Sequence, residues 1–248
     1  RTGEAIAAAR QAVADLPASA ALHSGLLLTL HNDPAIHPHD LFAEHQRWAA
    51  RHAAGIAPLQ LPEPDLAPDR PLRVGYVSPD FRRHPVAEFF EPLLAAHDPR
   101  AVETFCYASV QHPDDATARL RQRAHWRDIH PLSDTDAAAL VRNDRIDILV
   151  DLAGHTAGNR LLLFARRPAP IQLTWLGYPN TTGLSAIDCR LTDSLVDPPN
   201  TTDALCTEQL LRLESPFLCY QPPHDAPAVA HLPAADGRPL TFGCFGAA

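Results

Sequence analysis

The sequence lacks several features that would assign it to a common class of protein. Its 248 residues contain no methionine and no lysine, so all 21 basic residues are arginine, against 29 acidic residues and a formal net charge of −8. A nucleic-acid binder needs an extended basic surface to neutralise phosphates, and this excess of acid argues against one. We interpret the absence of lysine as the codon bias of a GC-rich genome, without functional meaning.

Paired cysteines and long apolar runs are also missing. The five cysteines are widely spaced and form no CxxC pair, which is typical of a reducing cytoplasm and argues against a disulfide framework or a zinc site. No apolar run approaches the length of a membrane span, and no signal peptide opens the chain. We therefore expect a cytoplasmic protein with neither a membrane nor a nucleic acid as partner.

Motifs that would identify common nucleotide sites and nucleophiles are absent too. Gly75 stands alone in the first predicted strand and forms no GxGxxG, and there is no P-loop or GxSxG. Asp134-Thr-Asp136 does form a DxD, the pattern with which one class of glycosyltransferases holds a divalent metal against a diphosphate. Ser133 and Asp134 precede an alanine-rich helix, so helix capping explains them better, and we expect no metal.

Residues 1–55 have the periodicity of helices. One apolar face ends at Pro17, a leucine-rich face containing Leu26 and Leu30 ends near residue 32, and a third helix is expected over residues 38–52. The third helix should turn four residues inward: Phe42, His45, Trp48 and Ala49. The first two helices fit the end of a tetratricopeptide array or a plain helical hairpin. In either case their apolar faces should be buried against the next domain.

Residues 56–71 are proline-rich and predict a stiff linker. Strand and helix patterns then alternate over residues 72–222, which predicts an α/β fold, a Rossmann-like, doubly wound parallel sheet. After Asp188 the chain is expected to be irregular as far as Pro239. Residues 223–248 would then be a connection and, from Leu240 to Phe245, the first strand of an incomplete second Rossmann-like domain.

The segment Ile146–Gly183 is the most informative stretch. Two buried strands, ending at Val150 and Leu176, lie on either side of a short helix, and each is followed by a polar loop. Parallel strands place their carboxyl ends at one edge of the sheet, where open α/β sheets bind ligands. The loops that follow three strands should therefore line one cleft: Ser78–His84, Gly154–Thr156 and Tyr178–Gly183.

Several residues of these loops could carry chemistry. His84 precedes a helix that begins at Pro85, where an imidazole could act as general base or donate to a phosphate, or simply be exposed to solvent. His155 could face the cleft or hydrogen-bond its own loop. Thr181 and Thr182 could contact phosphate or sugar, or could form a turn.

Three segments resemble a known family: LRVGYVSPDFRRHPVAEFF (72–90), DILVDLAGHTAGNRLLLFARRPAPIQLTWLGYPNTTGLSAIDCRLTD (147–193) and EQLLRLESPFLCYQPP (208–223). They strongly resemble the O-GlcNAc transferase and SPINDLY family of glycosyltransferases, and more narrowly a bacterial member. The resemblance implies the first half of a GT-B fold preceded by tetratricopeptide repeats that receive the acceptor protein. It also implies inverting, metal-independent transfer of a sugar to Ser or Thr hydroxyls. GlcNAc from UDP-GlcNAc is the sugar and donor that we expect.

The family's His-Pro motif matches His84 and Pro85. The resemblance implies that His84 belongs to the active site, as catalytic base or as a positioning group. The residues expected to contact substrate are Pro85, His155, Thr156, Tyr178, Thr181 and Thr182. Positions that bind the nucleotide lie mostly in a second Rossmann-like domain, so this chain is expected to be the acceptor-side half.

The partners expected of the chain are acceptor proteins or peptides, the nucleotide-sugar and the missing C-terminal domain. The nucleotide-sugar is a substrate, and no cofactor is expected. The alternative is a non-catalytic module that recognises a protein or a nucleotide-sugar through its helices and its Rossmann-like domain. The sequence decides neither the donor sugar, nor the acceptor, nor the oligomeric state.

Overall fold

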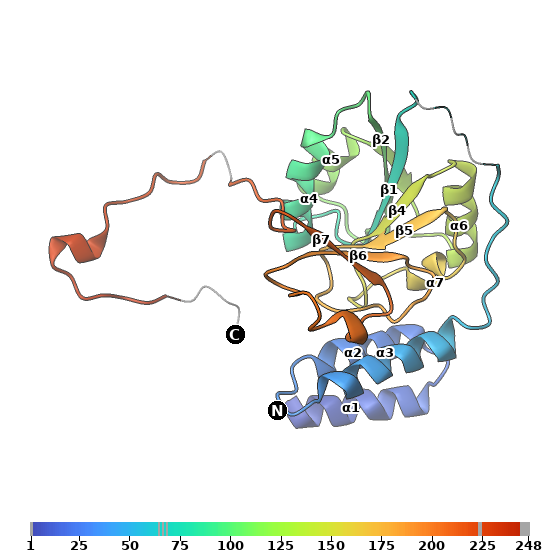
Figure 1. Cartoon of the computed structure of the whole chain (residues 1–248), viewed down its shortest axis with the longest axis horizontal. Helices are drawn as coiled ribbons and strands as arrows, with labels where there is room; N and C mark the ends of the chain where they lie inside the picture. The colour runs from blue at the N-terminus through green and yellow to red at the C-terminus, as the bar shows by residue number, and fades with distance from the viewer. Residues whose placement is uncertain (1, 64, 66, 68, 223–224, 244–248) are drawn as a thin grey trace.

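The computed structural model describes residues 2–63, 65, 67, 69–222 and 225–243. Three helices open the chain: α1 (Thr2–Asp15), α2 (Ala20–Leu30) and α3 (Pro38–His52). The hydroxyl of Ser19 accepts from the N–H of Leu22 and caps α2, while Pro38 stands in the first turn of α3, where its missing N–H costs nothing. The three helices lie side by side below the sheet (Figure 1), as the periodicity predicts.

A seven-stranded parallel sheet forms the rest of the fold, in the order β3-β2-β1-β4-β5-β6-β7. Its strands are β1 (Leu72–Ser78), β2 (Val102–Ala108), β3 (His125–Asp128), β4 (Ile148–Asp151), β5 (Ile171–Thr174), β6 (Cys189–Asp193) and β7 (Gln209–Leu213). The order grows outward in one direction from β1 and in the other from β4, as in a doubly wound sheet. The predicted Rossmann-like α/β class is confirmed.

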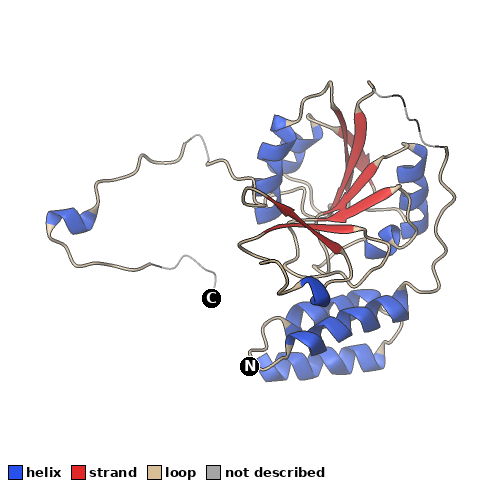
Figure 2. Ribbon diagram, viewed as in Figure 1, coloured by secondary structure: helices blue, strands red, loops and turns tan. Residues whose placement is uncertain are grey.

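Four helices flank the sheet: α4 (Pro85–Ala96), α5 (Asp115–Arg121), α6 (Asp134–Asn143) and α7 (Leu161–Phe164). The pair α4 and α5 covers one face, and α6 and α7 cover the other (Figure 2). Parallel crossovers are right-handed, so reversing the winding between β3 and β4 moves the following helices to the opposite face.

The two faces of the sheet carry separate cores. Along β2, Phe105 and Tyr107 belong to the core on the α6 and α7 side, while Cys106 belongs to the core under α4 and α5. The first core continues into the N-terminal helices, where Leu30 and Trp48 are at most 1% exposed. Leu26 is 3% exposed in the same cluster, so the helices are packed on the Rossmann-like domain as predicted.

Two sequence expectations are wrong for the C-terminal third. Residues after Asp188 include β6 and β7, and between them the short 3-10 helix η1 (Asp203–Leu205). The apolar pattern of a buried strand is missing in β6 because this strand contains a buried charge. Arg190 is buried and forms an ion pair with Asp197 at 2.5 Å. The irregular stretch therefore begins only after Leu213.

The strand expected from Leu240 to Phe245 is also wrong where it can be assessed. Residues 240–243 are not in a strand, and residues 244–245 lie outside the described part of the chain. Leu240 and Phe242 are 73% and 89% exposed, since no neighbouring strand among the described residues pairs with this segment.

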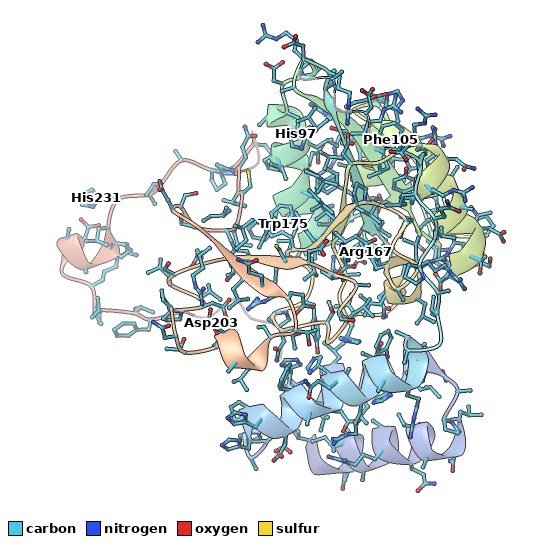
Figure 3. The ribbon with its side chains drawn as sticks, turned by 45° about the vertical axis from the view of Figure 1, so that its right-hand side comes forward. His97, Phe105, Arg167, Trp175, Asp203 and His231 are labelled. Atoms are coloured by element: carbon cyan, nitrogen blue, oxygen red, sulfur yellow. The ribbon has the colours of Figure 1, made fainter. Side chains whose placement is uncertain are left out.

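The C-terminal segment extends away from the sheet and carries a second 3-10 helix, η2 (Pro233–Asp236) (Figure 1). His231 lies on this extension, well clear of the sheet (Figure 3). Among the described residues, no helix is long and apolar enough to cross a membrane.

Candidate active site at the carboxyl edge of the sheet

The loops that follow β1, β4 and β5 lie at one edge of the sheet, because all the strands are parallel. The winding reverses between β1 and β4, which is where doubly wound folds bind ligands. The three loops also touch. A Cβ added at Gly158 would lie 3.0 Å from Pro79 in the loop after β1, and one added at Gly154 would overlap Tyr178 in the loop after β5. The predicted gathering of the three loops is confirmed.

The loop after β1 is firmly anchored before it reaches its exposed end. Phe81 is fully buried, and its carbonyl accepts a hydrogen bond from the Thr117 hydroxyl at 2.7 Å. The N–H of Arg83 donates to Asp114 at 2.7 Å, which ties the loop to the start of α5. These bonds hold the following residue, His84, in a fixed position relative to the sheet.

His84 is the N-cap residue of α4. Its extended backbone (φ −156°, ψ 148°) brings Nδ1 to 3.2 Å from the N–H of Val86, which donates to it. Asp80 Oδ2 lies 3.7 Å from the same nitrogen, and 35% of the imidazole side chain is exposed. Pro85, exposed in the first turn of α4, needs no hydrogen-bond partner for its nitrogen. The imidazole is therefore held from one side and open on the other.

Asp151 closes β4 and shapes the loop that follows. The carboxylate is 1% exposed and accepts hydrogen bonds from the N–H groups of Ala153 and Gly154 and from the Thr174 hydroxyl at 2.8 Å. Burial raises the pKa of Asp151 to about 6, against the lowering effect of these hydrogen bonds. This side chain joins the ends of β4 and β5.

His155 points into the protein. Its Nε2 lies 2.9 Å from the carbonyl of Thr182, which can only accept, so Nε2 carries the proton. Its Nδ1 lies 2.9 Å from the hydroxyl of Ser24 on α2. The side chain is 1% exposed, and burial followed by the nearby imidazole of His45 lowers its pKa to about 3. His155 is a neutral link between the N-terminal helices and the loops.

Tyr178 makes a second link of the same kind. Its hydroxyl lies 2.8 Å from Nε2 of His31, at the end of α2, and 2.9 Å from Nε2 of His45 on α3. Burial lowers the pKa of His45 to about 4, so this ring is neutral at pH 7. We call this set of contacts between the helices and the loops the histidine seam: Ser24, His31, His45, His155 and Tyr178.

Thr181 and Thr182 are fully buried and face Glu208, which lies just before β7. The Thr181 hydroxyl donates to the carboxylate at 2.5 Å, and Thr182 donates through its backbone N–H at 2.8 Å and through its hydroxyl. The carboxylate thus holds the turn that ends at Gly183. This arrangement agrees with the interpretation of the two threonines as turn formers.

The comparison with protein families decides the chain's affiliation. Residues 27–222 match the model for glycosyl transferase family 41. The chain belongs to that family. The matched residues include nearly all of the segments that resemble this family in the sequence, with the His-Pro pair at the start of α4 among them.

Curated proteins from plants and animals are similar to this chain over more than half of its length. The barley (Hordeum vulgare) protein "Probable UDP-N-acetylglucosamine--peptide N-acetylglucosaminyltransferase SPINDLY" is 45% identical over 210 residues, 83% of this chain and 22% of its own length. The "UDP-N-acetylglucosamine--peptide N-acetylglucosaminyltransferase" of Caenorhabditis elegans is 38% identical over 59% of this chain and 13% of its own length. The chain thus spans about a fifth of the length of the barley relative and less of the Caenorhabditis elegans one.

A solved structure shares the fold. The K341M mutant of the Thermobaculum terrenum O-GlcNAc transferase superposes with a TM-score of 0.87 at 42% identity, over 92% of this chain and 44% of that one. The helices and the parallel sheet described above are therefore those of a family 41 protein.

The seven predicted site residues of this family 41 chain divide into two groups. One group is at least partly exposed at the edge: His84, Pro85 and Thr156. The other is buried, with its polar atoms bonded within the chain: His155, Tyr178, Thr181 and Thr182. Contact of any of them with substrate stays a prediction. The geometry gives the buried group the role of holding the loops in place.

Two carboxylates of the DxD lie at the start of α6. Ser133 caps the helix by accepting from the N–H of Asp136 at 3.1 Å, and Asp134 forms an ion pair with Arg160 at 2.8 Å. The capping interpretation is confirmed for Ser133, whereas Asp134 is the first residue of the helix and pairs with Arg160. Within the described ranges, no group of three or more His, Cys, Asp or Glu side chains is arranged to hold a metal ion.

The sequence patterns did not identify four residues that shape this family 41 site: Ser24, His31, Asp151 and Glu208. Ser24 and His31 contact residues more than 130 positions away, and no local pattern marks such a contact. A signal existed for Asp151, since a carboxylate that ends a buried strand just before a glycine-containing loop needs partners there.

A cavity of about 400 Å³ lies at the opposite, amino edge of the sheet, beneath the linker. Among its charged wall residues, Arg70 pairs with Asp147 at 2.7 Å and Arg73 pairs with Glu103 at 2.9 Å. The cavity is remote from the loops after β1, β4 and β5, so its volume does not mark the candidate site.

Proposed function

We propose that this chain is the acceptor-side half of an inverting glycosyltransferase that moves GlcNAc from UDP-GlcNAc to Ser or Thr hydroxyls of proteins. Membership of family 41 and the printed names of the relatives support this proposal. The single observation that carries it is the placement of His84, held rigidly but open, at the switch point between β1 and β4.

The chemistry needs what this edge provides. An inverting transfer requires an acceptor oxygen in line with the leaving diphosphate and hydrogen-bond donors around the reacting groups, with no covalent enzyme intermediate. The chain covers 44% of the structural relative and 22% of the barley relative. We therefore assign the other wall of the cleft, including most of the nucleotide contacts, to a second Rossmann-like domain.

The N-terminal helices extend the proposal to the acceptor. They are interpreted as the end of a tetratricopeptide array that brings an acceptor protein to the cleft. The histidine seam fixes these helices to the loops, so an acceptor bound to them would have a defined position relative to His84. The protein is proposed to be bacterial and cytoplasmic, and the transfer to need no cofactor.

The test is a donor screen with the complete protein. UDP-GlcNAc, GDP-fucose and other nucleotide-sugars are offered with acceptor peptides, and transfer is followed by mass spectrometry with and without EDTA. We expect EDTA-insensitive transfer from UDP-GlcNAc with inversion at the anomeric carbon. The isolated chain, which lacks half of the cleft, should show none. Binding of a nucleotide-sugar without transfer or hydrolysis would favour the non-catalytic module instead.

A further inference from the structure

The hydrogen bonds of His84 restrict what its imidazole can do. We propose that His84 acts in the transfer as a hydrogen-bond donor through Nε2–H, and that it is not the general base. This inference rests on the proposed function and goes further, because it assigns the residue one of the two roles that sequence leaves open.

The position of the ring proton follows from the cap of α4. A backbone N–H can only donate, so the Val86 N–H at 3.2 Å requires a lone pair on Nδ1 of His84. A neutral imidazole has one N–H, which must then be on Nε2. Since Nδ1 is occupied by the cap, Nε2 is the ring nitrogen left to contact a substrate, and 35% of the side chain is exposed.

A general base would need the opposite arrangement. Its Nδ1–H would donate to a carboxylate, leaving the lone pair of Nε2 free to take a proton, as in an Asp–His pair of a hydrolase. Asp80 is the candidate carboxylate, but its Oδ2 lies 3.7 Å from Nδ1, beyond hydrogen-bond distance, and its Oδ1 accepts from Arg82 at 3.3 Å. The Val86 N–H therefore occupies the position that the carboxylate of a base pair would take.

The charges around the ring are few. Asp80 is buried in the same loop, and Arg82 pairs with it; Arg83 turns away to Asp115 at 2.7 Å. Protonation of Nδ1 would place its N–H against that of Val86 and remove the cap of α4. The helix start therefore favours the tautomer that carries its proton on Nε2.

The transfer step balances without His84 as base. The bond from the anomeric carbon to the diphosphate oxygen breaks, and its electron pair leaves with the nucleoside diphosphate. A bond forms from the acceptor oxygen to the anomeric carbon, and the hydroxyl proton passes to solvent water. During this step Nε2–H of His84 stabilises developing charge by donating to an oxygen of the bound substrates.

Three replacements in the complete protein test the role. Gln places an N–H group near the position of Nε2 but cannot act as a base; Asn retains an acceptor for the cap but does not reach as far; Ala removes both. We expect kcat/KM for His84→Gln within about 10-fold of wild type, and His84→Asn and His84→Ala lower by about 10²-fold or more. Equal losses for Gln and Ala would overturn the proposal.

Asp80→Asn provides a second kinetic arm. A carboxylate that orients a base is worth about 10⁴-fold in rate, whereas here we expect a loss of less than about 10-fold. A larger loss, toward the roughly 10⁴-fold of an orienting carboxylate, would make Asp80 and His84 an acid–base pair and would overturn the donor assignment. The melting temperature of each variant is measured to confirm that it folds.

A direct measurement separates this inference from the proposed function. The ¹⁵N shifts of His84 in the substrate-free complete protein, assigned by the signal lost in His84→Gln, report which ring nitrogen carries the proton above pH 8. We expect a protonated Nε2 and a bare Nδ1; the reverse tautomer overturns the inference. If wild-type protein transfers no sugar, the proposed function fails while this result still stands.

Discussion

His84 and His155 each follow a strand of the same parallel sheet and lie at the same edge, yet they have opposite surroundings. His84 is 35% exposed and bonded on one nitrogen, whereas His155 is 1% exposed and bonded on both. Strand direction decides which edge of the sheet a residue reaches. A second layer, helices α2 and α3, decides whether that residue meets solvent or becomes part of the interior.

The difference lies in what covers each loop. Helices α2 and α3 contact the loops after β4 and β5 through Ser24 and His45, and among the described residues no hydrogen bond joins either helix to the loop after β1. We therefore expect substitutions in the histidine seam to change stability first, and substitutions of His84 to change transfer first.

The largest expected effect is that of His84→Ala on transfer. Removing the imidazole should lower kcat/KM of the complete protein by at least ~10²-fold, while the free energy of unfolding falls by only about 1 kcal/mol, the size of a lost cap. Steady-state kinetics and thermal unfolding measure the two. His39→Ala, an exposed position on α3, is the matched control and should change neither; near wild-type turnover in His84→Ala would remove this residue from the mechanism.

Acid should weaken the seam selectively. Burial lowers the pKa of His45 to about 4 and of His155 to about 3, against 6.5 for the free side chain. Folded protein thus binds fewer protons than unfolded protein, so the stability from these rings is complete above pH 6.5 and declines as pH falls below it. From pH 7 to pH 5 the two rings together should cost roughly 4 kcal/mol.

One buried carboxylate opposes this trend. The pKa of Asp151 is raised to about 6, so between pH 7 and pH 5 this carboxylate takes up a proton in the folded protein but not in the unfolded one. This uptake should add roughly 1 kcal/mol to the free energy of unfolding over the same interval. Urea unfolding at pH 7, 6 and 5 measures the net loss. His155→Asn cannot be protonated and should flatten the profile; an unchanged slope in that variant would mean that His155 does not carry the effect.

Gly183→Ala should destabilise the contact between loop and helix by about 2 kcal/mol. Gly183 has φ 72°, and an added Cβ would lie 2.5 Å from the carbonyl oxygen of His45. Gly25→Ala is the control, because Gly25 lies within α2 with open space where its Cβ would be, and should be neutral or stabilising. Urea unfolding of both variants tests the pair, and equal stabilities would show that the close approach is unimportant.

The smallest expected effect is that of Tyr178→Phe. The change keeps the ring but removes the hydroxyl that His31 and His45 share, which leaves buried nitrogens without that partner and should cost about 1 kcal/mol. Tyr220→Phe, at a side chain that is 60% exposed, is the control. If both changes are neutral in thermal unfolding, packing alone holds the seam together.

The sequence predicts the centre of the sheet better than its margins. Strands β1, β2, β4 and β5 are apolar runs, and their pattern is sufficient to find them. The strands at the margins have no such pattern. Strand β3 reads His-Trp-Arg-Asp, and β6 contains Arg190, which is buried because Asp197 neutralises its charge. A strand whose burial depends on an ion pair with a later residue has no local signature.

The same limit applies to the site. Topology alone predicts that the loops of His84, His155 and Tyr178 share an edge, because parallel strands require it. It does not predict which of them stays open, since that depends on helices more than 100 residues earlier in the chain. Family resemblance identified His84 but contained no information on the seam.

The span of those contacts also sets an order of events during synthesis. Helix α3 emerges from the ribosome long before its partner loop, since His45 and Tyr178 are 133 residues apart. At bacterial or eukaryotic elongation rates this delay is roughly ten seconds. During that time Trp48, fully buried in the finished fold and in contact with the ring of His155, lacks this partner from the loop after β4. We expect nascent chains stopped before residue 178 to bind chaperones that recognise apolar helices, and to release them once the loop after β5 has been made.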